Sequence, residues 1–281
     1  MRSAALRASA ATPARVTWAG ALADSALTRS GGITQPVAGF ESTAFRLAAG
    51  TLIWIGTVGP QHPRTVLVDT SQSVTTPLVI PAGVQFSNQQ RPETLGTQWF
   101  QAIHPARVAS RAVLGVMAQH KPAGLALLLT GATLPFPLSH RAADALALAR
   151  ACGSGDVTLF AQSAGHLLGA GGGLTPSGDD FVGGALFALR WRGADARWQQ
   201  AAQDILTCAQ QRTHVISATL LSDLAGGQSY ATLHHFAAAV ARADETGAGR
   251  HATDLIGIGA SSGWDMLAGF IAALCGTLDL R

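Results

Sequence analysis

The pattern of apolar and polar positions divides the 281-residue chain into two parts of different texture. From about residue 14 to residue 91, β-branched residues occur in short runs broken by Gly and Pro, which is typical of strands. The intervals between these runs are too short for helices. The pattern therefore predicts a small, mostly antiparallel, barrel-like β-domain, with strands over Arg15–Ala19, Thr51–Val58, Thr65–Asp69 and Val74–Ile80.

From about Thr97 the apolar residues recur every three to four positions in Ala- and Leu-rich segments, the period of an amphipathic helix. Strands followed by helices indicate an α+β fold. We expect a β-rich domain over residues 1–96 and an all-α helical domain over residues 97–281, with Gly-rich loops at helix starts. The expected helices are Thr97–Gln119, Ser139–Cys152, Asp156–Leu168, Ser177–Trp191, Asp195–Gln211, Val215–Ala225, Tyr230–Ala243, Thr253–Ile258 and Ser262–Leu274.

Composition and charge exclude several classes of protein. The net charge of +3 comes from scattered bases, whereas a nucleic-acid-binding surface needs clustered ones. The apolar stretches are far shorter than a membrane span requires. Three widely spaced cysteines favour a reducing compartment over a disulfide framework. We therefore expect a cytoplasmic protein that binds neither nucleic acid nor membrane.

The most unusual stretch is Gly169-Ala-Gly-Gly-Gly-Leu-Thr-Pro-Ser-Gly-Asp-Asp180, at the start of an expected helix. Glycines allow positive φ angles and inward-pointing backbone N–H groups, and a helix start adds unpaired N–H groups and a positive dipole end. Asp179 and Asp180 are candidates for holding Mg²⁺ against a bound phosphate, or for acting as a base. The candidates for binding an anion are Gly171, Gly172, Gly173, Thr175, Ser177 and Gly178.

Known loop templates do not fit this stretch. It lacks Gly-Lys-Ser/Thr, and G-x-G-x-x-G fails at Leu174 or Pro176. A structural interpretation stays open, because Ser177-x-x-Asp180 fits a capping box that satisfies helix N-terminal donors. Capping leaves the glycine run, the Thr-Pro step and the second carboxylate unexplained, and these features favour a binding site.

A second stretch, Ser262-Gly-Trp-Asp-Met-Leu-Ala-Gly269, repeats the pattern of Ser177–Gly184. Each copy places a Ser-Gly pair at an expected helix start and an Asp in the first turn. The repeat predicts two similar helices whose starts face one pocket if they pack pseudo-symmetrically. The alternative is that two buried helices share packing rules by coincidence. The repeat makes Asp265 a further catalytic candidate, and Ser262 and Gly263 further binding candidates.

A third segment, Arg212-Thr-His-Val-Ile-Ser217, opens another expected helix and groups residues that can contact an anionic substrate. We take His214 as a catalytic candidate and Arg212, Thr213 and Ser217 as binding candidates. The alternative is that Thr213 is an ordinary N-cap and Ser217 is a helix surface residue. A hydrolase elbow at 259–263 is disfavoured because no His follows His251, and no Cys/His spacing supports zinc.

Three segments together resemble the AllH subunit family of oxamate carbamoyltransferase: residues 173–181, 213–221 and 258–269, read as GLTPSGDDF, THVISATLL and IGASSGWDMLAG. The resemblance extends from about His166 to Leu274, and much of the family is catalogued as a domain of unknown function. In purine and allantoin catabolism, the enzyme that the chain resembles interconverts oxalurate and phosphate with oxamate and carbamoyl phosphate. It has more than one kind of subunit. The resemblance implies small anionic substrates and either partner subunits or a homo-oligomer.

Two functions are open at this point. As an enzyme subunit, the chain binds the phosphate of carbamoyl phosphate on the loop Gly169–Ser177. Asp179, Asp180 and Asp265 then position a cation or the attacking amide, and the segment 212–214 holds the carboxylates. As a structural or regulatory partner subunit, the chain uses its glycine loops only as helix caps and packing points.

Overall fold

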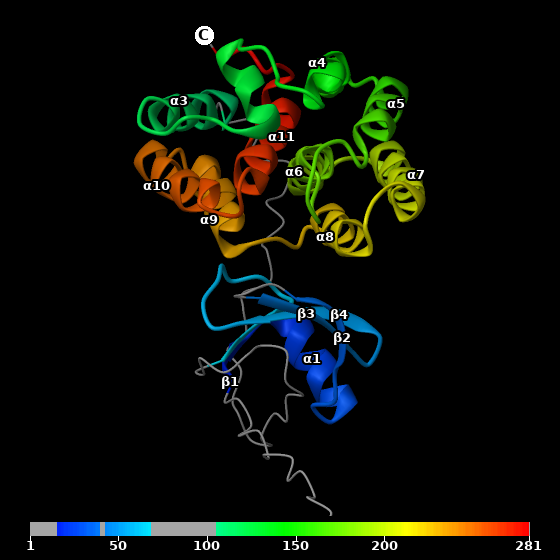
Figure 1. The fold of residues 1–281 in the computed structure, drawn as a ribbon. Coiled ribbons are helices and arrows are strands. Elements are labelled where there is room, and N and C mark those ends of the chain that lie inside the picture. Colours follow the sequence, from blue (N-terminus) through cyan, green and yellow to red (C-terminus); the bar gives the residue numbers. More distant parts are fainter. Residues whose placement is uncertain (1–15, 40–42, 69–104, 281) are drawn as a thin grey trace, which may run out of the picture. The chain divides into compact units, whose positions relative to one another are not determined.

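The computed structural model describes residues 16–39, 43–68 and 105–280 of the chain. The chain forms two compact units, residues 1–89 and 90–281, and each is described by itself. Figure 1 shows an N-terminal unit built around a sheet and a C-terminal unit of helices. The expected domain boundary between residues 96 and 97 and the expected strand Val74–Ile80 lie outside the described residues.

The N-terminal unit contains a five-stranded sheet in the order β1-β5-β4-β3-β2. Strands β4 and β5 are parallel, and the other neighbouring pairs are antiparallel. The predicted α+β class is thus confirmed. The barrel-like form is wrong, because among the described strands β1 and β2 lie at opposite ends of the sheet and do not pair with each other. The strands are β1 (Val16–Ala19), β2 (Gln35–Gly39), β3 (Thr43–Ala48), β4 (Thr51–Gly56) and β5 (Thr65–Val68).

One helix, α1 (Ala21–Ser30), packs against β3 and β4, although the sequence predicted no helix in this half. Its buried residues Ala23, Ala26 and Leu27 have the spacing of one helix face. It ends at Gly31, whose φ of 60° and N–H bonds to preceding carbonyl oxygens close the last turn. Small apolar residues give a weak helical pattern, so the packing on the sheet decides this element.

The C-terminal unit is helical. Helices are present at the expected places among the described residues, and those over Ser177–Trp191 and Val215–Ala225 have the predicted ends. The first part of the expected helix Thr97–Gln119, up to residue 104, lies outside the described residues. Helix α10 begins at Glu245, earlier than the expected Thr253. No helix among the described residues is long and apolar enough to cross a membrane. The elements are α3 (Pro105–Met117), η1 (Gly124–Thr130), η2 (Leu138–Arg141), α4 (Ala142–Ser154), α5 (Val157–Leu167), α6 (Ser177–Trp191), α7 (Ala196–Arg212), α8 (Val215–Ala225), α9 (Ala231–Ala241), α10 (Glu245–Ile256) and α11 (Ser262–Cys275).

Helices α6 and α11 lie in the middle of the helical unit, with the other helices around them (Figure 1). Every residue of α6 up to Leu189 is buried, as is every residue of α11 from Gly263 to Leu274. A helix that is buried all round is a core element, and the amphipathic helices cover it. The core therefore fixes the two repeated segments firmly in place.

Candidate functional site

The first turns of α6 and α11 lie side by side. The hydroxyl of Thr175 lies 3.0 Å from that of Ser262, and the hydroxyl of Ser177 lies 3.3 Å from that of Ser261. These two pairs connect the loop before each helix with the start of the other. The structure therefore brings together the two repeated segments that the sequence singled out.

The glycine of each Ser-Gly pair packs against the end of the preceding helix. A Cβ on Gly178 would lie 1.9 Å from the carbonyl oxygen of Leu167, and a Cβ on Gly263 would lie 1.8 Å from that of Leu255. Both contacts are too close for any side chain. These two binding candidates thus have an equivalent packing role, which gives the repeat a physical basis.

Asp179 is a clamp between the glycine loop and α8. Its Oδ1 accepts a 2.8 Å hydrogen bond from the Gly169 N–H. Its Oδ2 accepts a 2.7 Å bond from the Ser217 hydroxyl and another from the Thr213 hydroxyl. Because both carboxylate oxygens have donors, the side chain holds the loop in position against the segment that joins α7 to α8.

Asp180 and Asp265 are the two equivalent carboxyl groups, and both are buried in the first turns of α6 and α11. Asp265 Oδ1 accepts a 2.6 Å hydrogen bond from the Leu125 N–H. The Oδ2 atoms of both side chains are buried and have no hydrogen-bond partner within the described residues. A buried carboxylate oxygen without a donor costs free energy, which a proton on the carboxyl relieves.

The surroundings shift the pKa of both groups upward. Burial raises the pKa of Asp265 to about 7, and the hydroxyls of Ser261 and Ser177 and the Leu125 N–H oppose the shift. Burial also raises the pKa of Asp180 well above its usual value. The Ser262 and Thr175 hydroxyls lower the pKa of Asp180, whereas the charges of Asp265 and Asp179 raise it further. Each carboxyl is therefore influenced by a hydroxyl from the other helix start.

The backbone donors of the site lie in the loop and at Ser177, and not in the rest of the first turn of α6. The N–H groups of Gly178, Asp179 and Asp180 already donate to the carbonyl oxygens of Ala170 and Pro176. The five N–H groups from Gly171 to Thr175 donate no hydrogen bond within the described part of the chain. Gly171 and Gly173 have φ angles of 118° and 85°, and Gly172 and Gly173 are exposed. Consecutive free N–H groups in such a turn are a known arrangement for binding anions.

In the segment between α7 and α8, the predicted binding residues hydrogen-bond to other parts of the protein. The Arg212 guanidinium donates to the carbonyl oxygen of Gly165. His214 is the N-cap of α8 and accepts a 3.2 Å bond from the Ile216 N–H, whereas Thr213 follows the end of α7. The alternative N-cap at Thr213 is therefore wrong, as is a surface position for Ser217, which is buried against Asp179.

Metal ligation has little support in the described residues. Within residues 16–39, 43–68 and 105–280, no group of three or more His, Cys, Asp or Glu side chains could hold a metal ion. Asp179 already accepts three hydrogen bonds. Mg²⁺ at Asp179 and Asp180 stays a prediction.

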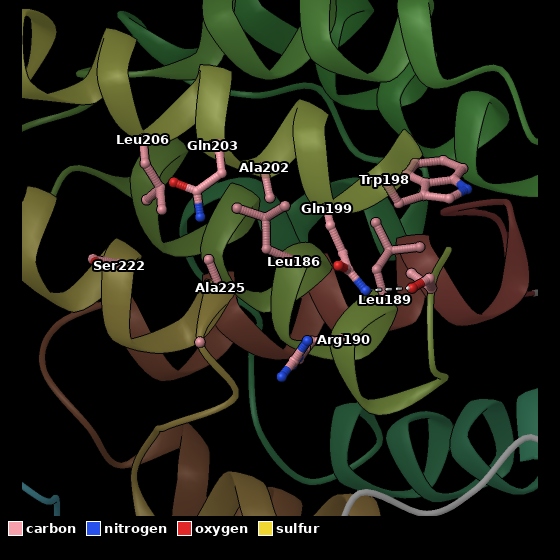
Figure 2. Close-up of a pocket in the computed structure, with 12 residues that line it drawn as sticks. Leu186, Leu189, Arg190, Trp198, Gln199, Ala202, Gln203, Leu206, Ser222 and Ala225 are labelled. Atoms are coloured by element: carbon pink, nitrogen blue, oxygen red, sulfur yellow. Dashed lines mark hydrogen bonds between the residues drawn. The ribbon is translucent and has the colours of Figure 1, made fainter. Parts of the chain in front are cut away.

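A separate cavity of about 370 Å³ lies between α6, α7 and α8. Figure 2 shows Leu186 at its floor, with Ala202 and Gln203 on one wall and Ser222 and Ala225 on another. Along α6 it begins about 12 Å beyond Gly178, so it is distinct from the glycine loop. Sequence reasoning missed it, because the space depends on how far apart three helices lie.

Residues 167–274 match a family model described as oxamate carbamoyltransferase subunit AllH. The match makes this segment similar to the AllH family. It contains the glycine loop, the Asp179 clamp and both Asp-bearing helix starts, and it confirms the resemblance given by three short segments. No curated protein and no solved structure gives a significant match to the chain.

Proposed function

We propose that the chain is a subunit of an oxamate carbamoyltransferase-like enzyme, and that its glycine loop binds the phosphate or carboxylate group of the substrate. The observation that carries the proposal is the run of five N–H groups from Gly171 to Thr175, inside the segment that matches the AllH family. These groups donate no hydrogen bond within the described residues. The half-buried hydroxyls of Thr175, Ser261 and Ser262 lie beside this run and add further donors.

The proposed reaction converts oxalurate and phosphate into oxamate and carbamoyl phosphate. A phosphate oxygen attacks the ureido carbonyl carbon, the bond to the oxamate nitrogen breaks, and that nitrogen takes up a proton. Fixed N–H and hydroxyl donors lower the barrier by orienting the phosphate and stabilising negative charge. Asp179 has a positioning role in this scheme, because it holds the loop to α8.

Asp180 and Asp265 are the proposed acid–base groups. Hydroxyls of the two helix starts influence both carboxyls, and burial raises both pKa values. The pKa of about 7 for Asp265 suits proton transfer at physiological pH. His214 and Arg212 are proposed to hold the second anionic group of the substrate from the α7–α8 segment. If the reaction needs a cation, Asp179 and Asp180 would hold Mg²⁺, which would supply positive charge against the bound phosphate.

The second candidate is a non-catalytic partner subunit. The packing of Gly178 and Gly263 and the three hydrogen bonds of Asp179 favour it, because these features stabilise the fold without a ligand. Because the chain is similar to a subunit family, it is proposed to assemble with other subunits in either case. The two functions differ in whether the loop itself binds small anions.

A thermal-shift titration of the purified chain tests the proposal. The ligands are carbamoyl phosphate, phosphate, oxamate and oxalurate, each with and without Mg²⁺. A ligand at about 100 times its Kd adds about 2.7 kcal/mol of stability. Thr175→Val removes one hydroxyl donor at nearly constant shape and should weaken the shift, whereas Thr253→Val on the exposed face of α10 should leave it unchanged. If no ligand shifts the wild-type chain, the loop of the isolated subunit is not an anion site.

A further inference from the structure

We propose that the anion site takes up a proton together with its ligand: a tetrahedral dianion binds at the Gly171–Thr175 loop and the adjoining hydroxyls, while Asp265 changes from a carboxylate to a neutral acid. The inference rests on the anion site proposed above and adds the ionisation state in which that site binds. The ligand class is a phosphate-type dianion, for which sulfate is a suitable probe.

The position of Asp265 carries the inference. Its side chain is fully buried, and its Oδ2 has no donor within the described residues. Its Oδ1 is held by the Leu125 N–H of η1, so the carboxyl cannot turn away from the helix starts. The Ser261 hydroxyl pairs with that of Ser177, and both act on the Asp265 carboxyl. Ser177 also adjoins the loop, because a Cβ on Gly171 would lie 2.8 Å from the Ser177 backbone nitrogen. A ligand at the loop is therefore close enough to act on the charge of Asp265 without touching it.

Within the described residues, the groups that act on Asp265 and Asp180 are hydroxyls, a backbone N–H and other carboxyls, and none of them is a cation that would balance a negative charge on Asp265. From α6, the nearest charged group is Asp180, whose pKa the charge of Asp265 raises. From η1, the Leu125 N–H donates to Asp265. At the start of α9, the buried Tyr230 hydroxyl has a raised pKa because of burial and of Asp180 and Asp223, so it is neutral at physiological pH. A dianion bound at the loop is therefore repelled by the Asp265 carboxylate, unless a proton neutralises that carboxylate on binding.

The sign of the linkage follows from the pKa of about 7 for Asp265 in the free protein. A bound dianion favours the neutral acid and raises this pKa further. Below pH 6 Asp265 is already protonated, and binding takes up no proton. Above pH 7 one proton from solvent joins the carboxylate on binding, so the affinity falls about tenfold per pH unit.

The test is calorimetric titration of the purified chain with sulfate, which stays a dianion throughout, between pH 5.5 and 9. We expect a constant Kd below pH 6, a tenfold rise per unit above pH 7, and uptake of nearly one proton at pH 8.5 from runs in two buffers of different ionisation enthalpy. Asp265→Asn keeps the acceptor for the Leu125 N–H and carries no charge. It should bind sulfate with a Kd that does not change with pH, and at least tenfold more tightly than wild type at pH 8.5.

Asp254→Asn, an exposed change on α10, is the matched control and should behave as wild type. Binding of sulfate without proton uptake by the wild-type chain overturns the inference and leaves the anion site standing. The proton count needs no variant, so absence of uptake overturns the inference even if Asp265→Asn fails to fold. Asp180→Asn should still take up the proton, and loss of uptake in that variant would assign the proton to Asp180 and overturn the role of Asp265. If neither sulfate nor phosphate binds at any pH, the anion site itself is overturned and the inference with it.

Discussion

Gly184 and Gly269 occupy equivalent positions where α6 and α11 pack against each other. A Cβ on Gly184 would lie 2.0 Å from the carbonyl oxygen of Met266, and a Cβ on Gly269 would lie 1.9 Å from that of Phe181. Each glycine thus lets the backbone of the partner helix approach. This reciprocal contact brings the two helix starts together and forms the candidate site.

Replacing Gly269 by Ala should therefore separate the two central helices. We expect a loss of about 3 kcal/mol or more in the free energy of unfolding, because backbone atoms have to move. Gly165→Ala is the matched control within α5, where a Cβ meets nothing within 4 Å. It should raise the stability by about 0.5–1 kcal/mol by removing helix-interior glycine flexibility. Urea unfolding measures both, and equal effects would contradict the close approach.

Removing the Asp179 clamp should loosen the glycine loop. Asp179→Ala leaves the Gly169 N–H and two hydroxyls without their acceptor, at a cost of about 2–4 kcal/mol in unfolding free energy. Asp179→Asn should cost less, since the hydroxyls of Thr213 and Ser217 can turn to accept from the new amide. Hydrogen exchange should speed up in the Ala variant at the hydrogen-bonded amides next to the loop, Gly169, Ala170 and Gly178. Unchanged exchange there would show that the loop does not depend on the clamp.

The helices of the site could be predicted because the helical spacing of apolar residues and the glycines at the helix ends indicate the same bounds. In Ser177–Trp191 and Val215–Ala225 the helical period ends at Gly-containing joints, and the structure has the same bounds. The repeat of Ser-Gly-x-Asp also predicted two similar helices, whose starts would meet only if the helices packed pseudo-symmetrically. The matching close approaches of Gly178 and Gly263 show why the spacing has to be the same in both copies.

What the sequence left open depends on contacts between distant segments. The parallel pairing of β4 with β5 and the helix α1 follow from packing in the sheet unit, which short strand patterns do not encode. The roles of adjacent carboxyls are another case. Asp179 and Asp180 look alike in the sequence, yet one accepts three hydrogen bonds and the other has a buried oxygen without a donor.

His234 should make the protein sensitive to acid. Burial lowers its pKa to about 4, with a smaller effect from His235, and its Nε2 accepts a 3.2 Å bond from the Ser229 N–H. The unfolded chain binds a proton near pH 6.5 and the folded chain near pH 4, so stability falls as the pH drops between these values, by up to about 1.4 kcal/mol per unit. His234→Gln keeps an acceptor and does not titrate. Its unfolding free energy should depend less on pH in this window, as urea titrations at several pH values can measure. An unchanged slope would contradict a buried, neutral His234.

The cavity between α6, α7 and α8 gives the last prediction. Ala202 lines it from α7, so Ala202→Leu places an apolar side chain in existing space on a helix that accepts Leu well. The added burial should raise the unfolding free energy by about 1 kcal/mol. Its neighbour Ala201 is buried and does not line the cavity, so Ala201→Leu should instead cost about 1–3 kcal/mol through overpacking. Opposite signs for two adjacent substitutions in urea unfolding would confirm the open space, and destabilisation by both would contradict it.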